Sequence, residues 1–101
     1  MFVVHGTVPI DPDSREEARK FFAELAEKSR AEDGIVDYRV AMDVDDPSVF
    51  RFTEQYEDED AFETHMQTEH VQAFEERLAD WVAGEIDATQ FDVESSSELE
   101  F

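Results

Sequence analysis

Apolar residues recur with two periods along this chain, and the changes of period divide it into strands and helices. Alternation at every second residue is typical of a strand, and recurrence at every third and fourth residue is typical of an amphipathic helix. Alternation predicts strands over residues 2–10, 35–44, 49–57 and 85–93. Helical spacing predicts helices over residues 15–32, 59–66 and 69–82, the last two forming one broken region. The order β-α-β-β-α-β predicts an α+β, ferredoxin-like fold with an antiparallel sheet.

Residues that favour helix ends stand at the predicted helix boundaries. Ser14 and Glu17 match a capping box, with Asp13 as a competing cap, and Asp58 and Thr68 stand where the two later helices need an N-cap. Gly34 follows the first helix, where a residue with left-handed backbone commonly ends it. We therefore expect the helices to begin and end close to these residues.

The second and third predicted strands each have one predicted inner face. In strand 35–44 the alternating positions are Val36, Tyr38, Val40, Met42 and Val44. In strand 49–57 the shared face carries Phe50, Phe52, Glu54 and Tyr56. The buried stripe of helix 69–82 is formed by Phe74, Leu78, Trp81 and Val82. We expect these side chains to form the core, with one carboxyl among them.

Helices on one side of a four-stranded sheet leave its other face uncovered. That face is predicted to carry Val3, Ile35, Ala41 and Val49 besides charged groups. A symmetric pair of chains that packs sheet against sheet would remove these apolar side chains from water. The pattern therefore predicts a homodimer.

The length of 101 residues fits one domain, which we expect over residues 1–94 with an acidic tail over residues 95–101. The chain has no Cys, which excludes disulfides and thiolate metal sites. No apolar run approaches the roughly 18 residues of a membrane span. Because no basic and then apolar leader stands at the N-terminus, we expect a cytoplasmic protein.

The charge is strongly negative, with 28 Asp and Glu against 8 Lys and Arg and a formal net charge of −20. Nine Phe, two Tyr and one Trp in periodic positions indicate a folded chain rather than a disordered acidic one. Molar salt shortens the Debye length to about 3 Å and screens the self-repulsion, so we expect a halophilic protein from a salt-rich cytosol. Phosphate binding needs clusters of Lys and Arg, so neither nucleic acid nor an anionic membrane is an expected partner.

Glu54 and His65 are the candidate catalytic residues, because each is an ionisable group on an apolar face. A buried charge is costly, so such groups call for an explanation. Glu54 is either a carboxyl with a raised pKa that orients His65, or a structural residue that binds a backbone N–H or an Arg. His65 follows Phe62 by three residues and faces inward, either as a neutral proton acceptor or as a core histidine with a backbone partner.

The other two histidines favour structural roles. His70 begins the last helix, where a surface or helix-end position is expected, and His5 lies among apolar residues of the first strand. His65 and His70 are five residues apart across a helix break, without a second close set of His and carboxylate. This spacing argues against a metal site. The aromatic residues are expected mainly in the core, with some of them forming the wall of a flat pocket.

A series of short segments extends from residue 2 to about residue 93. It consists of Val3-Val4, Ser29–Tyr38, Asp45–Pro47, Phe50–Tyr56, Asp58–His65 and Thr68–Phe74. Their joint order resembles the antibiotic biosynthesis monooxygenase family, and more closely its small quinol-monooxygenase-like members. One departure is Tyr56, which stands where many relatives carry Trp.

The resemblance implies a dimeric α+β barrel with a cleft between the sheet and the helices. It implies that some members oxidise phenols or quinols with molecular oxygen and without metal, flavin or haem, so no cofactor is expected here. Other members degrade haem or isomerise small sugar-like signals. The haem-degrading branch uses an Asn and an axial His near the places that Gly6 and Glu75 occupy, so haem degradation is not expected.

Three hypotheses for function follow. The first is a cofactor-independent monooxygenase for a small phenolic or quinol-type molecule, in which His65 accepts the phenolic proton and Glu54 orients the imidazole or holds a water. The expected substrate-binding residues are Tyr38, Phe52, Tyr56, Phe62 and Trp81, with the two tyrosines donating to developing charge. The second is a non-catalytic small-ligand-binding or stress-related dimer. The third is a cofactor-free isomerase of the same fold.

Overall fold

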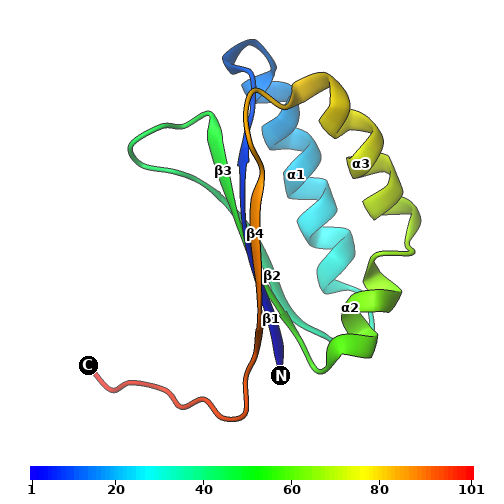
Figure 1. Cartoon of the computed structure of the whole chain (residues 1–101), viewed down its shortest axis with the longest axis vertical. Helices are drawn as coiled ribbons and strands as arrows, with labels where there is room; N and C mark the ends of the chain where they lie inside the picture. The colour runs from blue at the N-terminus through cyan, green and yellow to red at the C-terminus, as the bar shows by residue number, and fades with distance from the viewer.

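Four antiparallel strands form one sheet in the order β2-β3-β1-β4 in the computed structural model, which describes residues 1–101 (Figure 1). The strands are β1 (Phe2–Pro9), β2 (Ile35–Met42), β3 (Val49–Tyr56) and β4 (Asp87–Asp92). The helices are α1 (Arg15–Arg30), α2 (Glu59–His65) and α3 (Glu69–Trp81), preceded by the 3-10 turn η1 (Pro12–Ser14). All three α-helices lie on one face of the sheet. The predicted ferredoxin-like α+β arrangement is confirmed.

The inner face of β3 is built from aromatic residues and one carboxyl, Glu54. β3 lies between β1 and β2, so Glu54 is paired with Val4 on one side and with Tyr38 on the other. The neighbouring residues on that face of β3, Phe52 and Tyr56, are buried. The alternation in strand 49–57 therefore predicted its inner face correctly.

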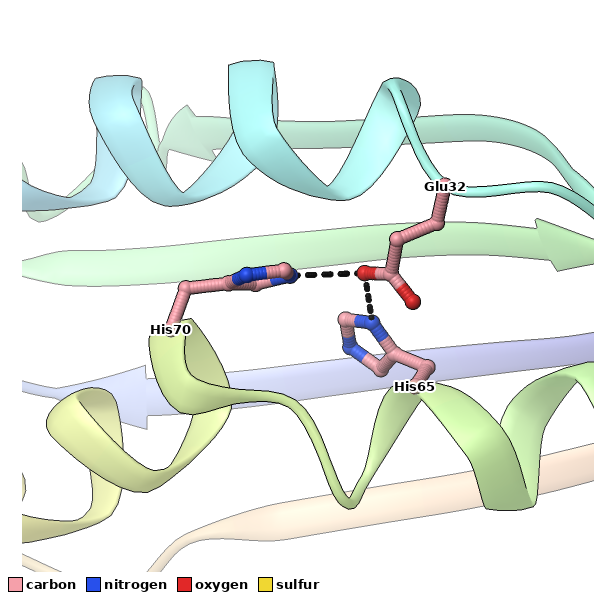
Figure 2. Close-up of side chains that lie close together, drawn as sticks. All are labelled: Glu32, His65 and His70. Carbon is pink, nitrogen blue, oxygen red and sulfur yellow. Dashed lines mark hydrogen bonds and ion pairs between the residues drawn. The ribbon is translucent and has the colours of Figure 1, made fainter.

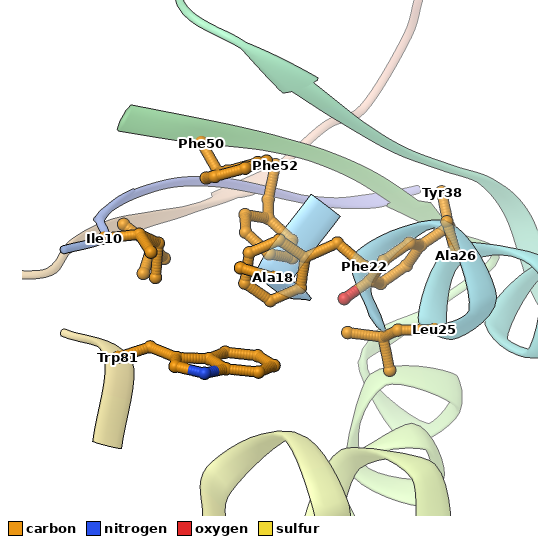
Figure 3. Close-up of a cluster of buried hydrophobic side chains, with 10 residues drawn as sticks. Ile10, Ala18, Phe22, Leu25, Ala26, Tyr38, Phe50, Phe52 and Trp81 are labelled. Carbon is orange, nitrogen blue, oxygen red and sulfur yellow. The ribbon is translucent and has the colours of Figure 1, made fainter. Parts of the chain in front are cut away.

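Phe22 of α1 lies at the centre of the core between the sheet and the helices (Figure 3). Its ring packs edge-on against Phe50 and Phe52 of β3, with centroids 4.9 and 5.2 Å apart. It also packs against Phe74 and Trp81 of α3, at 5.5 and 6.0 Å. Because aromatic pairs of this geometry add roughly 0.5–1.5 kcal/mol each beyond burial, this cluster fixes α1 and α3 against the sheet.

The helix ends confirm two of the three predicted N-caps. The side chains of Asp58 and Thr68 accept hydrogen bonds from the third residue of α2 and of α3, respectively. Ser14 precedes α1, but its side chain makes no capping hydrogen bond, so the predicted capping box is wrong. The chain instead enters α1 through η1, where the Asp11 carboxylate accepts from the Asp13 N–H.

The predicted alternation in strand 35–44 is wrong at its two ends. A register shift between Ile35 and Asp37 turns Val36 outward, where it is 50% exposed, and turns Ile35 toward the core. Ile35 therefore does not lie on the uncovered face as predicted. At the other end β2 stops at Met42, and Val44 lies in the following turn, 98% exposed.

The outer face of the sheet has no helix over it. The side chains of Val3 on β1 and Phe91 on β4 are paired across this face, and His5 packs against Phe91 with ring centroids 5.2 Å apart. Beyond β4 the tail from residue 95 has no regular structure. None of the helices has the length and apolar character that crossing a membrane requires.

Candidate functional site

A cavity of about 210 Å³ lies between the inner face of the sheet and the helices α2 and α3. Most of its lining is apolar, with side chains from all four strands and from both helices. The polar side chains in its wall are those of Tyr38, Glu54, His65, Glu75 and Asp87. Sites with a mostly apolar wall and a few convergent polar groups are typical of small-molecule binding.

Glu54 presents a carboxyl to this cavity from the middle of β3. It is 8% exposed, and the Tyr56 hydroxyl donates a hydrogen bond of 2.5 Å to its Oε1. Burial raises the pKa of the Glu54 carboxyl to about 7, while the hydrogen bond from Tyr56 acts in the opposite direction. The group can therefore hold or release a proton near neutral pH, as the functional alternative for Glu54 requires.

Tyr38 and Tyr56 remain hydrogen-bond donors. Burial, together with the negative charge of Glu54, raises the pKa of both hydroxyls well above the ordinary value. The Tyr56 hydroxyl is engaged by Glu54, whereas the Tyr38 hydroxyl makes no hydrogen bond to the protein although its side chain lines the cavity. The Tyr38 hydroxyl is thus free to donate a hydrogen bond to a ligand oxygen in the cavity.

His65 is the last residue of α2 and is 2% exposed. Its Nδ1 lies 2.7 Å from Oε2 of Glu32, and its ring stands 5.3 Å from the ring of Tyr38. Burial lowers the pKa of His65, which favours the neutral ring, although the Glu32 carboxylate acts in the opposite direction. A carboxylate only accepts, so Nδ1 carries the hydrogen and Nε2 keeps a lone pair. The imidazole is therefore arranged as a proton acceptor at Nε2.

Glu32 reaches His65 because the turn between α1 and β2 packs directly on α2. Gly34 in that turn has φ of +86°, a backbone conformation that favours glycine, and a Cβ built on it would lie only 2.8 Å from Cβ of Ala61. The carbonyl of Gly34 also accepts a hydrogen bond of 2.8 Å from the N–H of Glu57, just before α2. These contacts hold the Glu32 turn against the start of α2.

His70, on the first turn of α3, completes a cluster that the sequence did not predict (Figure 2). Its Nε2 lies 2.6 Å from the same Oε2 of Glu32, so one carboxylate oxygen accepts from both imidazoles. The donor atoms of Glu32, His65 and His70 all lie within 4.8 Å of one another. Spacing along the sequence does not reveal Glu32, because this residue is 33 positions before His65.

The structure brings most, but not all, of the predicted site residues to the cavity. Glu54, His65, Tyr38, Phe52 and Phe62 line it. No hydrogen bond joins the two candidate catalytic residues, because the carboxyl binds Tyr56 and the imidazole binds Glu32. It is therefore Glu32, and not the predicted Glu54, that orients the imidazole.

Tyr56 and Trp81 do not line the cavity. Tyr56 is fully buried and acts on the cavity only through its hydrogen bond to Glu54. Trp81 belongs to the core, where its ring stands 5.4 Å from that of Phe21 and beneath the guanidinium of Arg77. The helical stripe that contains Trp81 predicted its burial, and two other members of that stripe, Phe74 and Leu78, line the cavity.

Comparison with known proteins places this geometry in a family. Residues 1–77 match the model of the family named antibiotic biosynthesis monooxygenase. The putative monooxygenase YcnE of Bacillus subtilis (strain 168) is 32% identical over 74 residues, which cover 73% of this chain and 78% of YcnE.

Solved structures agree with this match. The crystal structure of an antibiotic biosynthesis monooxygenase is 26% identical, with a TM-score of 0.87 over 92% of this chain and 98% of that chain. A putative antibiotic biosynthesis monooxygenase from Deinococcus radiodurans is 22% identical, with a TM-score of 0.89 over 99% of each chain. The likeness to the second structure shows the fold alone.

Proposed function

This chain belongs to the antibiotic biosynthesis monooxygenase family, and we propose that it is a cofactor-independent monooxygenase for a phenolic or quinol-type small molecule bound in the cavity between the sheet and α2 and α3. The observation that carries the proposal is the buried His65. Its Nδ1 is held by Glu32 and its Nε2 is left without a hydrogen-bond partner in a mostly apolar cavity. An apolar wall suits an aromatic ring, and a neutral imidazole suits removal of its phenolic proton.

In the first step His65 Nε2 takes the phenolic proton, and the Glu32 carboxylate stabilises the resulting imidazolium. The same order of carboxylate, imidazole and hydroxyl operates in hydrolases with a Ser-His-Asp triad. The Tyr38 hydroxyl lines the cavity near this ring and donates to the phenolate oxygen. The product of the step is an electron-rich phenolate, which can transfer an electron to molecular oxygen.

The atoms and electrons of this oxidation balance with the phenol and O₂ alone, so no further reductant is needed. The phenolate gives one electron to O₂, and the two radicals combine in a carbon–oxygen bond. The O–O bond of this peroxide then breaks, and the hydrogen of the same carbon is removed as the new carbonyl forms. The second oxygen atom leaves as water, with one hydrogen from the phenol and one from that carbon. Glu54, with a pKa raised to about 7, is suited to protonate the departing oxygen.

An isomerase is the second candidate, because the cavity holds two separate proton-transfer groups, His65 and Glu54, in one apolar wall. Such a reaction moves a proton and uses no oxygen. A ligand-binding protein without activity would use the same cavity. The monooxygenase consumes oxygen and the two alternatives do not, so a requirement for oxygen distinguishes it from both.

The proposal is tested by oxygen uptake with a menadiol-like quinol, measured against autoxidation in the absence of protein. We expect wild-type protein to accelerate uptake and His65→Gln to abolish the acceleration. Glu63→Gln on the exposed side of the same helix is the matched control and is expected to retain it. Equal uptake by the His65 variant would remove this residue from the mechanism, and conversion of the quinol without oxygen would favour an isomerase.

We further propose that a second copy of the chain covers the outer face of the sheet. The apolar side chains of Val3 and Phe91 on that face support the proposal, since Phe91 is 43% exposed in the single chain. A pair of sheets packed face to face would bury them and leave the two cavities on the outer sides of the dimer.

A further inference from the structure

Glu32, His65 and His70 form a set of donor atoms that shares His65 with the cavity and adds Glu32 and His70, which do not line it (Figure 2). The cluster offers two imidazole nitrogens and one carboxylate oxygen within 4.8 Å of one another. Two His and one carboxylate are the protein ligands of several zinc and iron(II) sites, in which water or substrate occupies the remaining positions. We propose that this cluster binds one divalent first-row transition metal ion, with Zn²⁺ as its simplest probe.

The distances allow a metal after the side chains of the cluster adjust their spacing. Ligands at 2.0–2.2 Å from a tetrahedral zinc ion stand roughly 3.3 Å apart. The two hydrogen bonds to Glu32 Oε2 are 2.7 and 2.6 Å long and have to lengthen by a fraction of an ångström. The two imidazole nitrogens lie within 4.8 Å of each other and have to take up the same spacing around the ion. Glu32 has rotatable bonds for this movement, its side chain is 15% exposed, and its second oxygen has no partner.

Charge and access also favour a cation at this place. The His70 and Glu32 side chains are 17% and 15% exposed, so an ion can enter from solvent, while His65 is closed off at 3%. The net charge of −20 on the chain favours a bound positive charge. The ion replaces the two hydrogen bonds that now hold the cluster together.

The metal would lie behind His65 with respect to the cavity, since Glu32 and His70 are not part of the cavity wall. An ion on Nδ1 moves the ring hydrogen to Nε2, which turns the proton acceptor of the proposed function into a donor. This consequence rests on that proposed function, whereas metal binding itself does not. We therefore infer that the metal inhibits the oxygenase.

Binding is tested first, by isothermal titration with Zn²⁺ in excess Mg²⁺, which occupies weak surface carboxylate sites. We expect saturable binding of one Zn²⁺ per chain and a rise in melting temperature, both lost in His70→Gln and in Glu32→Gln. His70 is the more exposed ligand, so its variant keeps the test valid if a change at His65 prevents folding. His5→Gln and Glu69→Gln are matched controls outside the cluster and are expected to bind like wild type.

Two outcomes overturn the metal site. One is the absence of saturable Zn²⁺ binding to wild-type protein, and the other is unchanged binding in both cluster variants. A separate arm measures quinol-dependent oxygen uptake with and without Zn²⁺, and inhibition is expected in wild type and not in His70→Gln. Zn²⁺ binding in a protein that never consumes oxygen would contradict the proposed function and leave the metal site standing. Binding without inhibition would contradict only the role assigned to His65.

Discussion

At the scale of single residues, the raised pKa of Glu54 couples folding to pH. The pKa of its carboxyl is about 7 in the folded protein, against an ordinary value of 4.5. The folded state therefore holds a proton that the unfolded state releases, and the stabilisation is complete below pH 4.5 and is lost as the pH rises to 7. At 1.36 kcal/mol per pKa unit, the loss is on the order of 3 kcal/mol.

The prediction for Glu54 is checked by urea unfolding of wild type and Glu54→Gln at pH 5 and pH 8. The free energy of unfolding of the wild type, measured relative to the variant, should be lower at pH 8 than at pH 5. The variant provides the reference because its amide does not titrate. Glu57→Gln changes an exposed carboxyl next to the same strand and should show no such difference. A relative stability that does not depend on pH would show that Glu54 has an ordinary pKa.

Glu32→Gln tests the role of Glu32 in positioning His65. The amide keeps a similar shape but cannot stabilise the imidazolium, so we expect kcat for the quinol to fall roughly 100-fold with little change in KM. Asp33→Asn, an exposed neighbour, is the control and should retain kcat. If KM alone rises in the Glu32 variant, the carboxylate contributes to binding and not to proton transfer.

Periodicity was sufficient to find Glu54 and His65 but not Glu32. A carboxyl in a strand of aromatics and an imidazole three residues after Phe62 are visible as exceptions to an apolar pattern. Glu32 is one of 28 acidic residues and stands in a turn, where a charged residue is ordinary. Its contact with His65 depends on how the turn packs against α2, which no local pattern encodes.

At the scale of elements, the close approach of the α1–β2 turn to α2 builds the Glu32–His65–His70 cluster. Gly34→Ala is expected to destabilise the protein by about 2 kcal/mol, because of its positive φ and the contact with Cβ of Ala61. Ala61→Gly removes that Cβ and costs about 1 kcal/mol through lower helix propensity. The double variant should therefore lose less stability than the sum of the two single variants, as measured by urea unfolding. If the stability losses of the two single variants simply add, residues 34 and 61 are not in energetically significant contact.

Element order and type could be predicted, since the two periods and the turn residues agree with each other along most of the chain. The exceptions have local causes. A register shift at Ile35 and Asp37 reversed the faces at the start of β2, because one extra residue turns the preceding side chains to the other face. Trp81 was expected at the cavity, but it packs in the core against Phe21 and Phe22, and this tertiary contact cannot be read from spacing.

At the scale of the whole molecule, net charge and the uncovered sheet face determine behaviour in solution. A formal charge of −20 on 101 residues repels itself strongly in dilute buffer. We expect the melting temperature to rise by several degrees between low salt and molar KCl, because screening removes this repulsion. Differential scanning calorimetry measures the effect, and a melting temperature that does not change with salt would argue against halophilic adaptation.

The proposed dimer makes a separate prediction about mass. Phe91→Glu places a charge on the outer face of the sheet and should shift the protein from dimer to monomer in light scattering after gel filtration. Val44→Glu places the same charge at a fully exposed turn and should leave the mass unchanged. A wild-type protein that is monomeric in molar KCl would contradict the dimer.

The central claim is that, in the cavity beneath α2 and α3, one atom of molecular oxygen is bonded to a carbon of an aromatic ring with His65 as the base. It is tested most directly by incubating the protein with a phenolic or quinol substrate under ¹⁸O₂ and measuring the product by mass spectrometry. The account predicts one ¹⁸O atom per product molecule, formed faster than in the absence of protein, and loss of this acceleration in His65→Gln. A product without ¹⁸O, or equal formation by the His65 variant, would contradict it.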